Sequence, residues 1–180
     1  MSDHTAFIRD YLAATGSIHL TAMTNDPIEG SGVSGHHFGT DWQAAAKWAA
    51  TENSKQRNIY FSVAHIRPDL HNKAKKVDIT GIRWAHVDID PPKDNPAWDK
   101  QGALADLIAR GAPSVAIDSG NGIHGFWILS EPTDIATIEQ INRGIIERFN
   151  ADRTTWNADR VMRLPGTVNY PNAKKQALGV

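Results

Sequence analysis

The sequence predicts an α+β fold in which an antiparallel sheet carries helices on one face. The prediction comes from the order of elements in the second half of the chain, which reads strand, helix, strand, strand, helix, strand. An α/β pattern precedes it, and 180 residues with 41% hydrophobic and 22% charged content suit one packed domain. We expect a single domain at 1–180, divided into an N-terminal α/β layer at 1–80, a main sheet unit at 81–170 and a tail at 171–180.

The N-terminal layer is predicted from apolar spacing and turn residues. The cluster of Lys73, Lys75 and Lys76 at its end is more typical of a solvated loop than of a nucleic-acid contact. The elements expected before it are a helix at 3–16, a strand at 18–23, a glycine and histidine loop at 30–39, a helix capped by Thr40 and a strand at 58–64.

The second half supplies a βαββαβ order, which is the ferredoxin-like or RRM-like split unit with one free sheet face. A tight hairpin turn is expected at Asn121-Gly122. The other elements are a strand at 82–90, a Pro-rich link at 91–96, a helix at 100–110 stopped by Gly111, strands at 114–118 and 123–129, a helix at 134–150 and a strand at 160–164. The apolar spacing of the long helix predicts a buried face made by Ile135, Ile138, Ile141, Ile145 and Phe149.

Composition limits the chemistry of the protein. The chain has no cysteine, so any metal must be held by oxygen or imidazole, and a cytoplasmic location is expected. No apolar run approaches the roughly 20 residues that cross a bilayer, so we expect no membrane association. The net charge of -1 means that binding to nucleic acid would need a local basic patch.

The first candidate site lies on the strand at 82–90. Alternation along a strand puts His86, Asp88 and Asp90 on one face of the sheet. Two converging carboxylates repel each other, and a hard divalent cation relieves that repulsion. Asp-x-Asp at a strand end is equally typical of a solvated turn, so the motif needs support from other residues.

The second candidate site is the hairpin Ser119-Gly120-Asn121-Gly122-Ile123-His124. Glycines leave backbone N–H groups open to an anion, Ser119 offers a hydroxyl, and His124 can donate to a phosphate oxygen. A plain hairpin with a surface histidine is the alternative. The expected fold sets this strand beside the one that bears the two aspartates, so the turn should open onto them.

The third candidate site is the segment 152–169, which adds Asp152, Arg160 and Arg163. Strict alternation sends the two arginines to opposite faces of a strand, so both can meet phosphate only if the strand is irregular there. The alternative is that one arginine pairs with an acid.

Taken together, these motifs make the sequence resemble the archaeo-eukaryotic primase superfamily, especially the primase-polymerase domains of plasmid and phage replication proteins. The first family motif appears as Val87-Asp88-Ile89-Asp90, and the second as Ser119 to His124. The third appears as Asp152 followed by the stretch from Arg160 to Thr167. The resemblance covers residues 59–169 and implies an RRM-like palm.

The resemblance further implies a template-dependent nucleotidyltransferase. Its catalytic and metal residues would be Asp88, Asp90 and Asp152 on two Mg²⁺ or Mn²⁺ ions. Its substrates would be nucleoside triphosphates and a single-stranded DNA template, and a helicase domain or protein would be a partner. The residues implied to bind the nucleotide are Ser119, Gly120, Asn121, Gly122, His124, Arg160 and Arg163.

Two points differ from a simple match to the family. Both Asp152 and Asp159 precede the arginine strand; we choose Asp152 because its distance before Arg160 resembles the family pattern, whereas Asp159 would pair with Arg160 or support the site. The cysteine and histidine set of the zinc module that some relatives carry is also missing, so no zinc is expected.

Three other functions can use a similar fold. A non-catalytic nucleic-acid-binding module would stack bases on its open sheet, but Asp88 and Asp90 would repel the phosphates there. A replication-initiator nicking enzyme would need paired histidines and a tyrosine nucleophile, for which His86-Val87-Asp88 and Tyr170 are the nearest residues. A nucleotide cyclase would act on triphosphate without a template.

Overall fold

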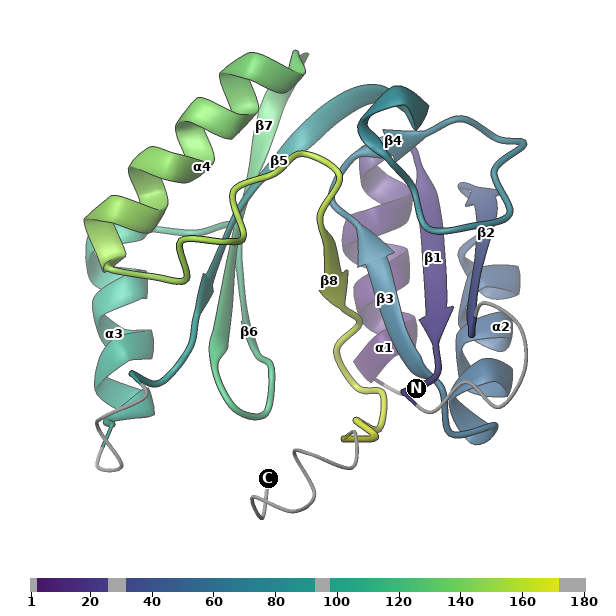
Figure 1. Ribbon diagram of the computed structural model, residues 1–180, viewed down its shortest axis with the longest axis horizontal. Coiled ribbons are helices and arrows are strands. Elements are labelled where there is room, and N and C mark those ends of the chain that lie inside the picture. The colour runs from purple at the N-terminus through teal and green to yellow at the C-terminus, as the bar shows by residue number, and fades with distance from the viewer. Residues whose placement is uncertain (1–2, 26–31, 93–97, 172–180) are drawn as a thin grey trace.

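The computed structural model describes residues 3–25, 32–92 and 98–171, and within them the chain forms two antiparallel four-stranded sheets (Figure 1). The predicted α+β class is confirmed. The first sheet has the strand order β2-β1-β3-β8 and the second β4-β5-β7-β6. Most of the predicted link at 91–96 and nearly all of the predicted tail at 171–180 lie outside the described residues.

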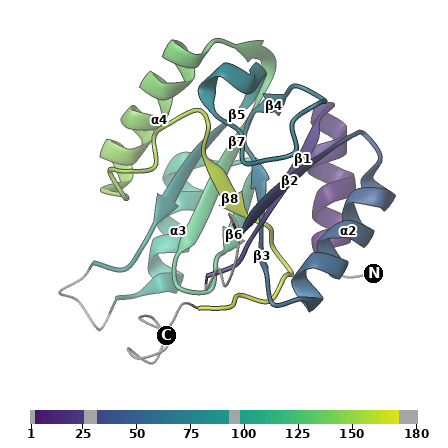
Figure 2. The same ribbon diagram turned by 45° about the vertical axis from the view of Figure 1, so that its right-hand side comes forward.

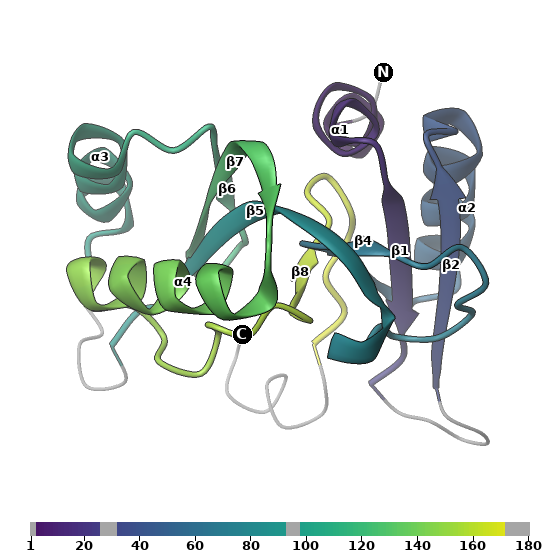
Figure 3. The same cartoon turned by 90° about the horizontal axis from the view of Figure 1, so that it is seen from above.

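The elements have the following bounds. The first sheet and its helices comprise α1 (Asp3–Phe7), which continues as the helical turns η1 (Ile8–Leu12) and η2 (Ala13–Thr15), then β1 (Ile18–Met23), β2 (Val33–Gly39), α2 (Trp42–Ser54), β3 (Asn58–Ser62) and β8 (Val161–Arg163). The second comprises β4 (His65–Ile66), η3 (Lys76–Asp78), β5 (Ile79–Ile89), α3 (Lys100–Gly111), β6 (Val115–Asp118), β7 (Ile123–Thr133) and α4 (Ile135–Phe149). Seen from above, α3 and α4 lie on the outer side of the second sheet and α1 and α2 beside the first (Figure 3).

One error of the sequence analysis concerns the last strand. The predicted main sheet used the strand at 160–164 as its fourth member, but β8 pairs with β3 through Tyr60↔Arg163 and Phe61↔Met162. The reason is burial, because Met162 packs into the hydrophobic core of the first sheet. β8 therefore lies at the boundary between the two sheets (Figure 2). The order β5-β7-β6 agrees with the ferredoxin-like unit, and short β4 takes the edge beside β5.

Smaller predictions were also wrong. The segment predicted as a loop at 30–39 contains β2, which pairs along β1; there Gly35 passes under the backbone of Asn72, where a Cβ would lie 2.2 Å from the carbonyl oxygen. The N-cap of α2 is Asp41, which accepts a hydrogen bond from the Ala44 amide, rather than Thr40. Helix α3 includes Gly111 and ends at Ala112 in the left-handed conformation.

The buried face of α4 differs from the predicted one. Ile138 is buried as expected, but Ile141 is 37% exposed, while Glu139 and Asn142 are buried. The chain that follows α4 folds back over this polar side, and the amide of Ala158 donates to Glu139. A polar stripe on α4 is thus enclosed by protein and becomes part of the site described below.

An aromatic cluster joins the two sheets into one core. Phe61 of β3 lies 5.5 Å, between ring centroids, from Phe126 of β7 and 6.1 Å from Trp84 of β5. Phe7 of α1 packs 5.1 Å from Phe61. Large buried aromatic rings contribute strongly to core stability, so the relative position of the two sheets is fixed by apolar packing.

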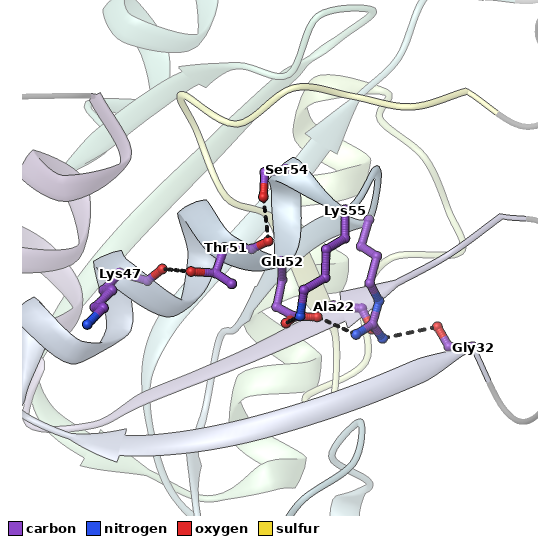
Figure 4. A network of polar contacts seen from close by, with 8 residues as sticks. Ala22, Gly32, Lys47, Thr51, Glu52, Ser54 and Lys55 are labelled. Atoms are coloured by element: carbon purple, nitrogen blue, oxygen red, sulfur yellow. Dashed lines mark hydrogen bonds and ion pairs between the residues drawn. The ribbon is translucent and has the colours of Figure 1, made fainter.

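A polar network fastens the end of α2 to the first sheet (Figure 4). Glu52 accepts from Lys55 Nζ at 2.6 Å and from Arg57 at 2.5 Å. Arg57 also donates to the carbonyl oxygen of Ala22 on β1 at 2.8 Å. Because Glu52 is buried, its charge requires these partners. The network is structural and lies in the first half of the chain, apart from the three predicted site motifs.

Candidate active site

Three carboxylates from two distant segments meet at the end of β5. Asp88 is in β5, Asp90 directly follows the last residue of β5, and Asp152 lies in the segment after α4. One oxygen from each side chain lies within 4.8 Å of the others. Asp159 is not part of this group; it accepts a hydrogen bond from Asn157 Nδ2 at 2.7 Å. The geometry therefore favours Asp152 as the third acid.

The unpaired edge of β5 places Asp152 in this group. Strand β4 pairs with β5 only as far as Gly81, so backbone groups farther along that edge need other partners. The Asp152 amide donates to the Asp88 carbonyl oxygen at 3.0 Å, and Asn142 Oδ1 accepts from the His86 amide at 3.0 Å. The backbone of the 150–160 segment thus occupies part of the edge where a fourth strand was expected.

A buried histidine and asparagine hold this segment against β5. His86 is fully buried, and its Nε2 lies 2.7 Å from the carbonyl oxygen of Thr155, which requires the proton on Nε2. Nδ1 is then the acceptor for Asn142 Nδ2 at 3.3 Å, and the same amide group donates to the Trp156 carbonyl oxygen at 3.1 Å. Burial lowers the pKa of His86 to about 4, so the ring is neutral at pH 7.

The position of Asp152 is fixed by a turn of its own. Its carboxylate accepts from the Thr154 amide at 2.9 Å and from the Thr154 hydroxyl at 2.8 Å. Its carbonyl oxygen accepts from the Thr155 hydroxyl at 2.9 Å. These bonds are local, as expected when an aspartate starts a turn, and they orient the carboxylate before any ligand arrives.

The electrostatics of the group fit a divalent cation. Loss of solvation raises the pKa of Asp90, and repulsion from Asp88 and Asp152 raises it further, against the opposing effects of His124 and a hydrogen bond from Asn121. Oδ1 of Asp88 is buried and has no hydrogen-bond partner among the described residues. Carboxylate oxygens are the ligands that Mg²⁺ and Mn²⁺ prefer, so these residues suit such an ion.

The hairpin lies against the carboxylates. A Cβ at Gly122 would stand 2.5 Å from the Ile89 carbonyl oxygen and 2.6 Å from Asp90 Oδ1, so only glycine allows this approach. Two of the turn amides that we expected to be open are occupied: Gly120 N–H donates to Asp118 and Gly122 N–H donates to the Ser119 hydroxyl. In the structure, these two amides stabilise the turn.

His124 lies beside Asp88 rather than at the surface. The two residues are paired across β7 and β5, and His124 Nε2 is 3.4 Å from Asp88 Oδ1. Only 6% of His124 is exposed, and its Nδ1 is buried without a hydrogen-bond partner among the described residues. Its charged partner among the described residues is a carboxylate, and the predicted contact of His124 with phosphate stays a prediction.

The two predicted arginines occupy different surroundings. Arg163 of β8 sits over the Tyr60 ring at 5.4 Å and donates to Asn169 Oδ1 at 2.5 Å. It lines a groove of about 310 Å³ together with Ser119 and Gly120 of the hairpin, the chain 164–167, Asp118 and Asn169. Arg160 precedes β8 and does not line that groove. Because it lies outside the strand, strand alternation does not determine which face its side chain occupies.

Sequence analysis missed Lys100, at the start of α3. Its Nζ lies 2.6 Å from Asp118 Oδ1 and donates to the Gly120 carbonyl oxygen at 2.7 Å, which clamps the hairpin. It also missed Asn142, whose position in a helix gave no sign that it reaches the edge of β5. Neither residue belongs to a sequence motif, and only the tertiary fold brings them to the site.

No family model matches the sequence, and no curated protein matches it, but solved structures share its fold. The AEP domain of the cyanophage S-2L primase-polymerase aligns over 97% of this chain and 93% of its own, with a TM-score of 0.60 and 16% identity. The catalytic domain of primase RepB', solved in complex with initiator DNA, aligns over 93% of this chain and 79% of its own, with a TM-score of 0.61 and 17% identity.

The chain has the fold of the archaeo-eukaryotic primases. A longer structure of primase RepB' aligns over 92% of this chain at 18% identity with a TM-score of 0.61, and the chain spans about half of that protein. The fold that the motifs imply is therefore the fold that this chain shares with these structures. None of the helices in 3–25, 32–92 and 98–171 is long and apolar enough to cross a bilayer.

The buried network predicts the effect of an Asn142→Leu substitution. Leucine has a similar volume but leaves the His86 amide, the His86 ring and the Trp156 carbonyl oxygen without their partners. Unpaired buried polar groups cost about 1–3 kcal/mol each, and burial of the apolar leucine side chain offsets part of that cost, so we expect the free energy of unfolding to fall by about 2–4 kcal/mol in urea denaturation. Gln140→Leu, on the exposed side of the same helix, is the control and should change it by less than about 0.5 kcal/mol. Equal effects of the two variants would contradict the account.

The raised pKa of Asp90 predicts that Asp90→Asn stabilises the folded protein. Above its folded-state pKa the ionised group destabilises the fold, while below its unfolded-state pKa it is protonated and the penalty is absent. In EDTA at pH 7, Asp90→Asn should raise the unfolding midpoint by roughly 1–3 °C, and the gain should shrink as the pH falls toward about 4. Asp106→Asn, which removes an exposed ion-paired acid, should give no such gain. A gain that is independent of pH would contradict this origin.

Proposed function

We propose that the chain is a template-dependent nucleotidyltransferase, a DNA primase or DNA polymerase domain that joins nucleoside triphosphates using two Mg²⁺ or Mn²⁺ ions. The observation that carries the proposal is the cluster of Asp88, Asp90 and Asp152 on a primase fold, next to a glycine hairpin. Binding to single-stranded DNA is part of the proposal, and a helicase domain or protein is the expected partner.

The three carboxylates would hold the metal ions. When bound, such ions lower the pKa of an attacking 3′-hydroxyl and stabilise the charge that develops on the transferred phosphorus and on the pyrophosphate. The protein contributes position: the edge of β5 fixes Asp152, and the Thr154 bonds orient its carboxylate. Because Asp88 Oδ1 has no hydrogen-bond partner among the described residues, the site need not break one there to accept a cation.

The groove between the hairpin and β8 would take the polyphosphate of the incoming nucleotide. Arg163 can donate to phosphate oxygens from one wall. Ser119 and Gly120 line the other wall, and Lys100 stabilises it through its bond to the Gly120 carbonyl oxygen. His124 Nε2 lies 3.4 Å from Asp88 Oδ1, so the buried ring would limit the movement of that carboxylate beside the ions. Asn121, Gly122, His124 and Arg160 remain proposed nucleotide contacts, although they do not line this groove.

The nicking alternative is disfavoured by the state of His86. A nicking enzyme of the type considered would need this side chain as a metal ligand, but both ring nitrogens are engaged in the interior by Thr155 and Asn142. The carboxylate cluster equally disfavours a plain binding module, because three acids on the working face repel phosphates unless cations are present.

The test is incorporation of labelled nucleotides on single-stranded DNA, with and without a primer, in Mg²⁺ or Mn²⁺, analysed on a gel. The wild type should extend a primer, and product without a primer would show priming. The Asp88→Ala, Asp90→Ala variant should lose at least about a hundred-fold in rate. Asp159→Ala, an acid outside the cluster, is the matched control and should retain activity. Folded wild-type protein that gives no product in any condition would overturn the proposed function.

A further inference from the structure

A second groove lies beside the segment that contains Asp152. It has a volume of about 350 Å³ and is formed by α4 and the chain that follows it. In Figure 1 this chain runs from the lower end of α4 across the front of β5 to β8. The groove shares no lining residue with the hairpin groove. Its lining is Arg143, Ile146, Glu147, Asn150, Arg153 and Trp156.

Trp156, in the lining of this groove, carries two cationic side chains over its ring. The Arg143 guanidinium carbon lies 3.7 Å from the centroid of the Trp156 ring, and Lys76 Nζ lies 5.2 Å from it. Cations over a tryptophan face are attracted by its π-electrons, so the ring holds both side chains in place. The ring is itself held, because the Trp156 carbonyl oxygen accepts from buried Asn142.

The charge of the groove is positive and only partly neutralised. Lys76 pairs with Glu139 at 2.5 Å, and Glu147 is in the lining. Neither Arg143 nor Arg153 forms an ion pair with any carboxylate in the described ranges. Lys76 therefore adds a third cationic side chain beside the two arginines, whereas exposed Lys73 and Lys75 line a different groove with Asp78. A protein of net charge -1 thus has a local basic patch beside its carboxylates.

This combination suits a single nucleic-acid strand. Single strands are bound by cations that follow the phosphates and by planar groups on which unpaired bases stack, and an arginine plane held on an aromatic ring supplies both. A compact triphosphate would be better served by the hairpin groove. Arg153 directly follows Asp152, so a strand in this groove would pass close to the carboxylates.

We propose that the groove between α4 and the 150–156 segment binds the single-stranded nucleic-acid template, with Arg143 and Arg153 on its phosphates and the Arg143–Trp156 stack under a base. The role of this strand as a template rests on the proposed function, whereas binding of a single strand can be tested without catalysis. Lys76 then becomes part of a binding surface, in contrast to the solvated loop that the sequence predicts for the lysine cluster.

The test is fluorescence anisotropy of a labelled oligodeoxythymidylate titrated with protein in EDTA, without nucleotides, at several salt concentrations. The Arg143→Ala, Arg153→Ala variant should bind at least about ten-fold more weakly. The slope of its log affinity against log salt concentration should be smaller in magnitude by about 1.4, because each phosphate contact on a single strand contributes about 0.7 through counterion release. The control is Arg110→Ala, Arg148→Ala, because these arginines lie over the Phe149 ring outside the groove. This control should change neither quantity.

The outcomes separate this proposal from the proposed function. Asp88→Ala, Asp90→Ala protein should still bind the strand in EDTA. The groove is not the strand site if the two double-arginine variants weaken binding equally, if neither weakens it, or if the wild type does not bind. That conclusion holds whatever the incorporation assay shows. If the groove variant alone loses binding but the wild type incorporates no nucleotide, the strand site stands and the proposed chemistry fails. An oligonucleotide carrying 5-iododeoxyuridine should crosslink to Trp156 on irradiation, and crosslinks confined to other residues would also overturn it.

Discussion

The unpaired edge of β5 is the constraint on which the rest of the site depends. Backbone groups of a strand edge need partners, and here β4 supplies them only at the start of the strand. Farther along, Asn142 and the Asp152 backbone take that role. The same bonds that satisfy the edge bring a third carboxylate next to two others. A fourth strand paired along this part of the edge would have competed with Asn142 and Asp152 for the same backbone groups.

The site combines rigid surroundings with unfavourable charge. The Asn142 and His86 bonds, the Thr154 turn and the close approach of Gly122 leave the acids little freedom to separate. Burial, and after it repulsion from Asp88 and Asp152, raises the pKa of Asp90. Proteins accept such local destabilisation where function requires it, and the aromatic core that joins the two sheets supplies stability elsewhere.

Sequence reasoning located the acids but not their supports. Strand alternation and the hairpin dipeptide were sufficient to place the hairpin strand beside the strand of the two aspartates, and β7 does pair with β5. The choice of Asp152 over Asp159 came from family spacing, and the structure brings that residue to the cluster. The partner of β8 could not be predicted, because a three-residue strand carries little pattern and its pairing depends on where Met162 is buried. For the same reason Asn142 and Lys100 escaped notice, since their contacts are long-range.

The central claim is that these three carboxylates form one divalent-cation site, and Mn²⁺ binding measured by isothermal titration calorimetry tests it most directly. Wild-type protein should bind Mn²⁺, Asp152→Asn should weaken that binding at least about ten-fold, and Asp159→Asn should leave it unchanged. The measurement needs no nucleotide or template, so it is independent of the polymerisation assay. Equal affinities for wild type and Asp152→Asn, or an equal loss in both variants, would contradict the account.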